Sequence, residues 1–399
     1  MEEKSVEKLF CFGKSNFTGN FIVKLCLGSN LTSDITKMAL LVSEENIDNI
    51  TAVELNAFQC IVASSEILNK LDNLKLDKNI KIFKSQDNIS FFNEGDIVEL
   101  ISDDKMTKLF VLYRIKSNNN VIIATNHCNN KCIMCPQPIY INKQDDVNTA
   151  RVEQIIKLMD KNTKYLTITG GEPTLLKEKL VQILIMCKKY LPNIRIQLLS
   201  NGRMFFYKSL VDQMNSVGIK FLELGIPIHS NNESIHDLIT QIPKSFTQTI
   251  TGVENLIASK NNVEIRIVIH KKNYLDLEKI SDLIVERLSG IDRVSFMGME
   301  MLGSAIQNSD DVWVPYKEMV NDLKGAILKL LTHNIKVSIY NIPLCKIDED
   351  LRPLCAKSIS DYKVRYLTEC EECKEKNNCG GIFVSSLSFL KKEGINPII

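Results

Sequence analysis

The chain has 399 residues, with 49 basic and 48 acidic side chains and a hydrophobic content of 44%. This composition is typical of a globular protein and excludes collagen-like, coiled-coil and disordered chains. The near-zero net charge disfavours a nucleic-acid-binding surface. No stretch approaches the run of about 18 apolar residues that indicates a membrane helix, so we expect no membrane partner.

Residues 1–118 contain short β-type runs and no clustered cysteine. We predict an α+β or β-rich accessory domain here, because β-branched and aromatic residues are concentrated in these runs. A polar stretch at residues 116–120 suits a linker after this domain. The expected strands are residues 21–27, 60–64, 80–83, 97–101 and 108–115.

Residues 119–345 alternate apolar runs with amphipathic helical stretches, a pattern that predicts a parallel sheet covered by helices. The fold class we predict is α/β, with a partial (β/α)6-type barrel whose site lies at the carboxyl ends of the strands. The expected strands are residues 121–125, 165–169, 194–199, 221–228, 263–269, 293–297 and 335–340. The expected helices are residues 151–160, 177–191, 206–217, 246–259, 275–288 and 316–332. Residues 346–399 lose this rhythm and form a third, cysteine-rich region.

Cysteine is the unusual residue, because the chain has 12. The first residues are charged and polar and no signal peptide is visible, which predicts a cytoplasmic protein with reduced thiols. Three cysteines lie within residues 128–135 and five within residues 345–379, and the other four are scattered. Such clustering predicts metal ligands rather than a disulfide framework.

The first cluster, Cys128, Cys132 and Cys135, directly follows the first expected barrel strand. Its Cys-x3-Cys-x2-Cys spacing places three thiols on one loop, which would leave one iron of a [4Fe–4S] cluster without a protein thiolate. The same loop could instead hold zinc, with a fourth ligand such as His127.

Three further loops at the ends of expected strands carry candidate ligand-binding residues. Gly170 and Gly171 let backbone groups approach a ligand closely, and Glu172 can accept hydrogen bonds from an ammonium group. Ser200 and Asn201 are short polar groups at the end of the third strand, where an ordinary Asn-Gly turn is an equal alternative. In the fourth and fifth units, His229 or Arg266 could face the barrel mouth.

The cysteine-rich tail supplies a second candidate metal site. Cys345, Cys370, Cys373 and Cys379 can provide four thiolates, which close a coordination sphere of either zinc or an iron–sulfur cluster. We expect Cys355 to be the spare cysteine, because it lies in the less ordered-looking stretch 351–357.

The motif of the first cluster resembles the signature of the radical S-adenosylmethionine (SAM) superfamily. The resemblance implies that Cys128, Cys132 and Cys135 hold a [4Fe–4S] cluster whose unique iron is chelated by SAM. It further implies reductive cleavage of SAM to a 5′-deoxyadenosyl radical that abstracts a substrate hydrogen atom. The family often has an aromatic residue before the third cysteine, where this chain has Met134. The residues expected to contact SAM are Met134, Gly170, Gly171, Glu172, Ser200, Asn201 and Arg266.

A narrower resemblance is to the radical SAM maturases of His-Xaa-Ser systems (HxsC type). It rests on residues 124–138, on Ser358-Ile359-Ser360-Asp361-Tyr362-Lys363 and on the Cys-x2-Cys-x5-Cys-Gly-Gly pattern that begins at Cys370. The resemblance implies a ribosomally made precursor peptide as substrate, an auxiliary cluster in the tail and an external electron donor. It also implies a second radical SAM protein as partner. Two alternatives remain from the sequence: a radical SAM enzyme acting on RNA or a small molecule, and a zinc-binding structural or interaction protein.

Overall fold

The computed structural model describes residues 10–28, 37–58, 60–71, 76–77, 79–103, 107–137, 149–360 and 363–399. The chain folds into two compact units that are not continuous in sequence. Unit 1 comprises Met1–Ile122, Asn148–Thr167 and Ile185–Ile194, and unit 2 comprises Ile123–Val147, Ile168–Leu184 and Arg195–Ile399. The division into domains at residues 1–118, 119–345 and 346–399 stays a prediction.

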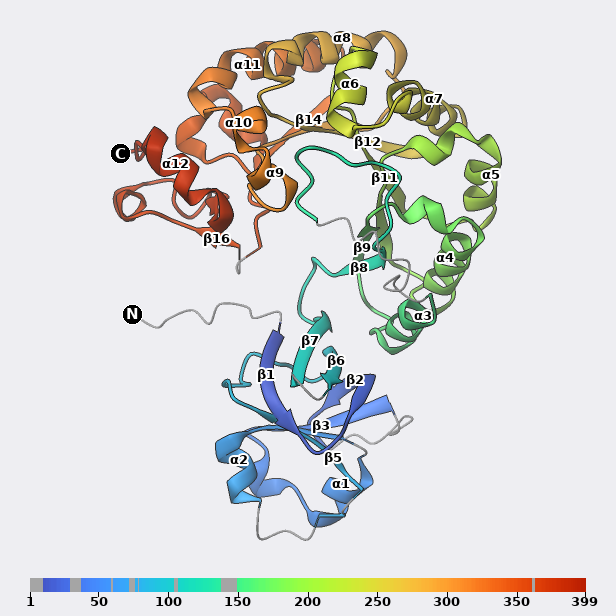
Figure 1. Ribbon diagram of the computed structural model, residues 1–399, viewed down its shortest axis with the longest axis vertical. Coiled ribbons are helices and arrows are strands. Elements are labelled where there is room, and N and C mark those ends of the chain that lie inside the picture. The colour runs from blue at the N-terminus through green and yellow to red at the C-terminus, as the bar shows by residue number, and fades with distance from the viewer. Residues whose placement is uncertain are drawn as a thin grey trace. The chain divides into compact units, whose positions relative to one another are not determined.

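Unit 1 contains a closed barrel with the strand order β1-β5-β4-β3-β2-β6-β7 (Figure 1). The neighbours β2, β3, β4 and β5 pair in parallel, and the remaining pairs are antiparallel. The five expected strands are therefore present, whereas the strands at residues 10–15 and 38–42 and the closure of all of them into a barrel were not predicted. Their bounds are β1 (Phe10–Ser15), β2 (Gly19–Cys26), β3 (Met38–Val42), β4 (Cys60–Ser64), β5 (Lys81–Ser85), β6 (Ile97–Ser102) and β7 (Thr107–Tyr113).

The parallel strands of this barrel are buried on both faces. Along β3, Ala39 and Leu41 pack into one apolar cluster, whereas Leu40 and Val42 pack into another. The second cluster includes residues of α1 (Ala52–Ala57) and α2 (Ser65–Lys70), so helices cover that face. Continuous apolar runs such as residues 39–42 follow from this two-sided burial.

Unit 1 also includes α3 (Thr149–Leu158), which is attached to the barrel by side-chain contacts. The Arg151 guanidinium donates to both carboxylate oxygens of Glu99, with distances of 2.6 and 3.1 Å. Gln154 donates its amide to the Ile22 carbonyl at 3.1 Å. Because the Arg151 pair is bidentate and Glu99 is buried, it fixes the orientation of α3 against β6.

A second sheet has eight strands in the order β15-β14-β13-β12-β11-β10-β9-β8, and its pairs from β10 to β15 are parallel. All seven barrel strands expected from the sequence are confirmed, and the fold is that of a partial β/α barrel. The bounds are β8 (Val121–Thr125), β9 (Tyr165–Gly170), β10 (Arg195–Leu199), β11 (Leu222–Pro227), β12 (Asn262–Val268), β13 (Arg293–Met297), β14 (Lys336–Tyr340) and β15 (Cys355–Ala356).

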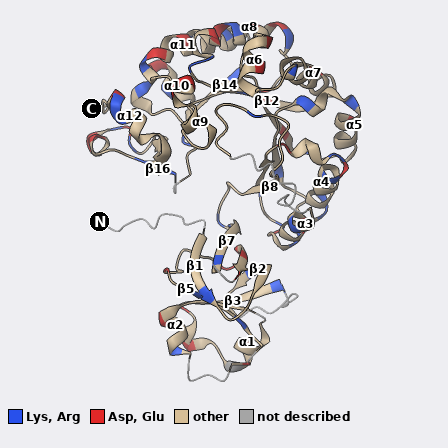
Figure 2. Ribbon diagram, viewed as in Figure 1, with Lys and Arg blue, Asp and Glu red and all other residues tan. Residues whose placement is uncertain are grey.

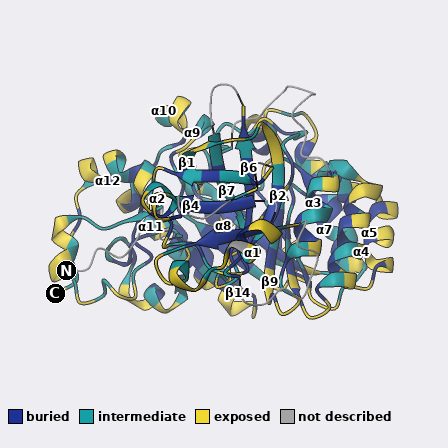
Figure 3. Cartoon of the chain, turned by 90° about the horizontal axis from the view of Figure 1, so that it is seen from below, coloured by how far each residue is buried: buried dark blue, intermediate teal, exposed yellow. Residues whose placement is uncertain are grey.

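The six expected helices of this region are also confirmed. They are α3, α4 (Glu178–Tyr190), α5 (Lys208–Ser216), α7 (Ser245–Ala258), α8 (Leu277–Arg287) and α11 (Tyr316–Thr332). Figure 3 shows exposed outer turns on α4 and α5, and Figure 2 shows both signs of charge interspersed along α8 and α11. The sequence did not predict the shorter helices α6 (Glu233–Thr240), α9 (Ser304–Gln307) and α10 (Ser309–Val312), because so few turns give little periodicity.

The cysteine-rich tail forms short elements around the last strands. The stretch 351–357, expected to be irregular, contains the end of η7 (Glu349–Leu354) and all of β15, which extends the eight-stranded sheet. The remaining elements are η6 (Leu344–Lys346), β16 (Val364–Arg365), η8 (Thr368–Glu372), β17 (Ile382–Phe383), η9 (Val384–Ser386) and α12 (Leu387–Glu393). Residues 361 and 362 of the quoted 358–363 motif lie outside the described residues. Within the described part of the chain, no helix has the length and apolar character needed to cross a membrane.

Candidate functional site

The cysteine loop begins where β8 ends and is fixed by backbone hydrogen bonds to the end of α6. Lys131 N donates to the Thr240 carbonyl at 2.9 Å, and Ile133 N donates to the Ile239 carbonyl at 3.0 Å. A loop with no regular structure of its own thus has its amides satisfied by a neighbouring element. The end of α6 therefore holds the cysteine loop in place through these two backbone hydrogen bonds.

The other side of the loop is fixed by the segment before and within α9. Ser304 N donates to the Cys135 carbonyl at 2.9 Å, and Asn308 Nδ2 donates to the Ile133 carbonyl at 2.8 Å. Gly303 has a φ of +60°, and a Cβ there would lie 2.7 Å from the Cys135 carbonyl oxygen. Only glycine permits both this backbone conformation and this close approach.

The three thiols of the loop lie in a shared, partly desolvated environment. Burial raises the pKa of Cys128 to about 11 and that of Cys132 to about 12, with neighbouring thiols adding to both increases. Burial also raises the pKa of Cys135. A metal that binds here must therefore displace protons from neutral thiols.

The donor set fits the implied cluster in chemistry, because three sulfur ligands from one short loop are available. Among the described residues, no three His, Cys, Asp or Glu side chains are arranged so that they could hold a metal ion. The fit of Cys128, Cys132 and Cys135 to a cluster thus rests on their chemistry and on their shared loop.

Gly170 and Gly171 bring the end of β9 against the cysteine loop. Gly171 N donates to the Thr125 carbonyl at 2.8 Å, and a Cβ at Gly170 would lie 2.2 Å from that same oxygen. A Cβ at Gly171 would lie 2.2 Å from the His127 carbonyl oxygen. The sequence predicted that this glycine pair would let the backbone approach a ligand closely. In the structure, the backbone at these glycines approaches the cysteine loop.

Glu172 is fully buried and joins the end of β9 to the end of β10. Its Oε1 accepts from Thr174 N at 3.0 Å and from Ser200 Oγ at 2.8 Å, and its Oε2 accepts from Asn201 N at 2.6 Å. Burial raises the pKa of this carboxyl group, while these donors act in the opposite direction. Glu172 therefore positions the expected SAM-contacting residues Ser200 and Asn201 relative to each other.

Asn201 and Arg203 connect the end of β10 to the cysteine loop. Asn201 Nδ2 donates to Asn129 Oδ1 at 2.6 Å and lies 4.0 Å from the Cys128 sulfur. Arg203 donates to the Asn129 carbonyl at 2.5 Å and to Asn130 Oδ1 at 2.8 Å. Arg203 was quoted in the sequence motif but not chosen as a site residue.

The charge of Arg203 favours deprotonated thiols nearby. Burial lowers its pKa, whereas attraction to Cys128, Glu172 and Cys132 opposes that change. A guanidinium stays protonated in proteins, so it provides a fixed positive charge beside these groups. Arg203 comes immediately after the Ser-Asn-Gly turn that ends a barrel strand. This position could have identified it as a site residue from the sequence.

Two expected SAM contacts lie in other surroundings. The Met134 side chain is buried in an apolar cluster with Met299 and Met301. Arg266 lies within β12, where its Nη2 is 3.4 Å from the Met297 sulfur. The structure thus groups Gly170, Gly171, Glu172, Ser200 and Asn201 around the cysteine loop, while Met134 packs in the core beneath it.

His229 is buried rather than open to the barrel mouth. It is 4% exposed, its ring centroid lies 5.2 Å from that of His236, and burial lowers its pKa well below the ordinary value. The imidazole Nδ1 has no hydrogen-bond partner among the described residues, so of the two alternatives for the barrel mouth, His229 is the buried one and Arg266 lies within β12.

Four tail cysteines line one small pocket. Cys345, Cys370, Cys373 and Cys379 contribute to its wall together with apolar side chains that include Leu344 and Ile382. The Cys379 sulfur accepts from Leu344 N at 3.5 Å and from Gly381 N at 3.4 Å. Burial raises the pKa of Cys345 to about 11, and the other three thiols contribute to this increase.

Cys355 does not line that pocket. It begins β15 and pairs with Ile339 of β14, and its sulfur is 3.8 Å from the Leu351 carbonyl oxygen. The reason given for a spare Cys355, an irregular stretch, is wrong because Cys355 begins a strand, and its role as the spare fifth thiol stays a prediction.

Residues 122–284 match the sequence model of the radical SAM superfamily. A curated relative, the GTP 3′,8-cyclase of Petrotoga mobilis, is 25% identical over 235 residues, which cover 56% of this chain and 70% of that protein. The GTP 3′,8-cyclase of Campylobacter jejuni RM1221 is 29% identical over 115 residues, covering 28% of this chain and 35% of that protein.

Solved structures give weaker similarities. SuiB of Streptococcus suis, bound to its precursor peptide SuiA, matches with 15% identity and a TM-score of 0.43. That match covers 55% of this chain and 48% of the SuiB chain, so this chain spans about half of SuiB. The enzyme anSMEcpe with bound AdoMet matches with 18% identity and a TM-score of 0.44, covering 55% of this chain and 64% of that one.

The family match begins at β8 and includes the cysteine loop, the Gly170–Gly171 turn and the end of β10. These are the same segments that the structure brings together around three thiols. The family implies one [4Fe–4S] cluster and SAM as cofactors. Over residues 122–284 the chain therefore matches the radical SAM superfamily, and this segment lies on the eight-stranded sheet of a partial β/α barrel.

Proposed function

We propose that this radical SAM enzyme abstracts a hydrogen atom from a ribosomally made peptide and so installs a post-translational modification. The observation that carries the proposal is the presence of two separate thiol groups, three on the loop after β8 and four around the tail pocket. This pairing supports the resemblance to peptide maturases of His-Xaa-Ser systems. The external electron donor, the precursor peptide and a second radical SAM protein are the partners that the proposal requires.

Cys128, Cys132 and Cys135 would hold the SAM-binding cluster, and Cys345, Cys370, Cys373 and Cys379 would hold an auxiliary cluster. When bound, the first cluster and SAM supply the one-electron chemistry by which a radical abstracts hydrogen. Both sites need a reducing compartment because their thiols must stay free of disulfides, and the raised pKa values of Cys132 and Cys345 mean that loading releases protons. A cytoplasmic location meets the first need.

The residues of this chain perform the positioning. Glu172 holds the ends of β9 and β10 together, and Arg203 fixes the loop through Asn129 and Asn130. Gly170 and Gly171 keep the end of β9 close to the loop, which leaves little room for water between them. Such fixed, water-poor surroundings protect a reactive radical from side reactions.

A second candidate is a radical SAM enzyme that acts on a nucleotide. The curated GTP 3′,8-cyclase relatives favour it, because one of them is matched over 70% of its length. The charge balance of this chain does not separate the two candidates, since a small nucleotide needs only a local binding site.

The test is mass spectrometry of a candidate precursor peptide that is co-expressed with the chain and encoded beside it. We expect a mass change in the peptide with the wild-type chain and none with Cys132→Ala. A parallel anaerobic incubation with GTP and SAM should leave GTP intact. Consumption of GTP with an unchanged peptide would overturn the peptide proposal in favour of the nucleotide candidate.

A further inference from the structure

A large pocket opens in unit 1, far in sequence from the cysteine loop. Its volume is about 800 Å³, which lies within the range of sites that enclose a drug-sized ligand. Residues 27, 41, 43–45, 64–67, 85–90 and 92–94 form most of its lining. These are the segments that follow the parallel strands β2, β3, β4 and β5.

The position of the pocket follows from the strand directions. Parallel strands end at one edge of a sheet, and ligands bind open α/β sheets outside the carboxyl ends of their strands. Ser43, Ser64 and Ser85 occupy the ends of β3, β4 and β5 and all line the pocket. Three hydroxyl groups are thus placed at equivalent points of neighbouring strands.

The floor of the pocket is apolar. Leu41, Ile67, Ile89 and Phe92 contribute side chains that are largely buried in the barrel and its helix layer. An apolar floor favours a ligand with apolar side chains. It does not favour a small, fully hydrated ion.

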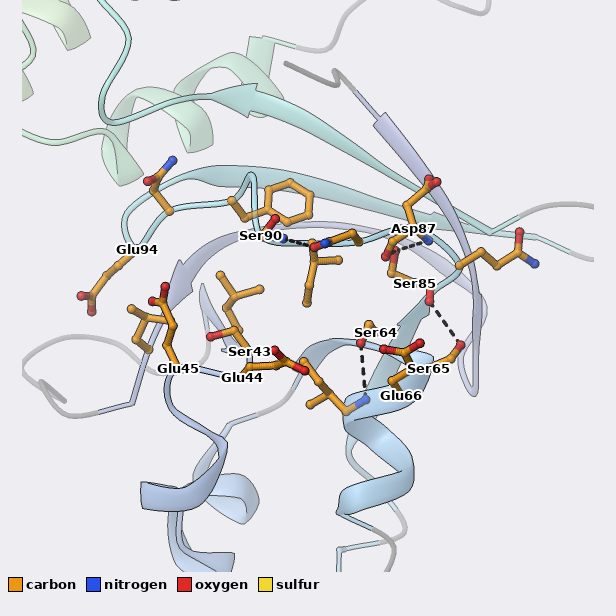
Figure 4. A pocket seen from close by; sticks show the side chains of 18 of the residues that line it. Ser43, Glu44, Glu45, Ser64, Ser65, Glu66, Ser85, Asp87, Ser90 and Glu94 are labelled. Carbon is orange, nitrogen blue, oxygen red and sulfur yellow. Dashed lines mark hydrogen bonds between the residues drawn. The ribbon is translucent and has the colours of Figure 1, made fainter. Parts of the chain in front are cut away.

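The rim of the pocket is strongly acidic, although the whole chain is almost neutral. Five acidic side chains and one basic side chain, Lys116, line it. Figure 4 shows Glu45 and Glu94 toward one end of the pocket and Glu66 toward the other. The remaining acidic residues are Glu44 and Asp87.

Three of these carboxylates are available to a ligand. Glu45, Glu66 and Glu94 are exposed, and among the described residues the rim ion pair is that of Glu44 with Lys70, while Glu94 accepts from the Cys26 thiol at 3.7 Å. They belong to three separate segments, the turn after β3, the first turn of α2 and the loop before β6, so they suit several positive charges spaced along a chain better than one point charge. Opposite charges across an interface provide specificity and accelerate association.

We propose that this pocket is a docking site for a basic, amphipathic peptide segment. Lysine or arginine side chains of the segment lie against the acidic rim, and its apolar side chains lie on the floor formed by Leu41, Ile67, Ile89 and Phe92. The serine hydroxyls at the strand ends hydrogen-bond within their own turns, as Ser85 does with Asp87 and Ser64 with Ile67, so they shape the pocket wall rather than bind the peptide. The proposal does not depend on the cysteine loop, so it can fail or succeed independently of the radical chemistry.

The test uses the full-length chain and a fluorescein-labelled peptide of alternating lysine and leucine, followed by fluorescence anisotropy. The pocket variant combines Glu45→Gln, Glu66→Gln and Glu94→Gln, and its matched control combines Asp212→Asn, Glu286→Gln and Glu318→Gln. The control residues are exposed on α5, α8 and α11, and both variants change the net charge equally. Thermal unfolding by circular dichroism establishes that both variants are folded.

We expect the pocket variant to weaken binding by about tenfold, because exposed charges each contribute modestly, and the control to bind like the wild type. Lys116→Glu should strengthen binding, since it removes the one basic side chain of the lining. Equal weakening by both triple variants would overturn the proposal, because it would show attraction to net charge alone. Absence of binding by the lysine–leucine peptide would also overturn it.

Two competitors separate the proposed occupant from other ligands. Spermidine carries comparable charge without apolar side chains, and we expect it to displace the peptide poorly. A peptide of alternating glutamate and leucine should not bind. Displacement by spermidine as effective as that by unlabelled lysine–leucine peptide would identify a general cation site and overturn the peptide proposal.

Discussion

The cysteine loop and the tail pocket use the same ligand type in opposite surroundings. The loop offers three thiols beside polar groups, with Asn201 and the cation of Arg203 close to Cys128. The tail offers four thiols in a pocket with apolar walls. Three ligands leave a coordination position open, whereas four close it. Under the proposed function, the loop would therefore admit a polar molecule to its metal and the tail pocket would exclude one.

The largest effect we predict tests the open site. Cys132→Ala should remove about four iron atoms per chain and reduce 5′-deoxyadenosine formation to background, because a cluster cannot be held by the two remaining thiols. Iron analysis and chromatography of SAM products measure both quantities. Cys187→Ala, a buried α4 cysteine, is the control and should retain both. Undiminished 5′-deoxyadenosine release by Cys132→Ala would contradict the assignment.

The next effect tests the closed site. Cys379→Ala should lose the tail metal, since it removes a sulfur that lines the pocket, whereas Cys355→Ala should keep it. Metal analysis of both variants after anaerobic purification gives the result and also distinguishes iron from zinc. We expect SAM cleavage to continue in both variants. Equal metal loss from the two variants would mean that Cys355 is a ligand.

A smaller predicted effect is the loss of stability when a glycine is replaced by alanine in each of the two regions. Gly171→Ala should destabilise the protein by roughly 1–3 kcal/mol, because its Cβ would lie 2.2 Å from the His127 carbonyl oxygen. Gly380→Ala in the tail has its nearest neighbour at 3.4 Å and should cost less than about 0.5 kcal/mol. Urea unfolding measures both. Similar costs at the two positions would contradict the close approach of β9 to the loop.

The smallest effect concerns pH. Burial raises the pKa of Glu172 above its ordinary value, so the folded chain keeps this proton to a higher pH than the unfolded chain does. The unfolding free energy should therefore decline as pH rises above that ordinary value, and Glu172→Gln should remove this part of the decline. Urea titrations of the metal-free chain at several pH values measure the slope. An identical slope in both proteins would assign the decline to other groups.

Much of the sheet and its helices was predictable because each strand is a short apolar run and each helix has a clear period. The end of each strand then located Gly170, Glu172 and Ser200 near one another, since parallel strands end at a common edge. The structure adds the direction of their hydrogen bonds. Glu172 accepts from Ser200 and Asn201, a bond pattern that depends on side-chain orientation and not on spacing.

The sequence did not predict the closed barrel of unit 1. Five of its seven strands were recognisable, but β1 and β3 were not, and closure depends on pairings such as β1 with β7, which join residues about 100 positions apart. Arg203 was not chosen for a similar reason. Its partners Asn129 and Asn130 lie more than 70 positions earlier, and no local pattern links them.

The attachment of α3 to the N-terminal barrel has a consequence for how such a chain diversifies. Arg151 and Gln154 bind Glu99 and Ile22, so a helix that belongs by sequence to the β/α repeat is a structural component of the preceding barrel. A recombination junction at residue 118 would transfer the N-terminal barrel without α3, the helix that binds it. Functional chimeras should therefore need residues 148–167 from the same parent as the barrel. Substitutions at Glu99 and Arg151 should be acquired together, because the two side chains form an ion pair.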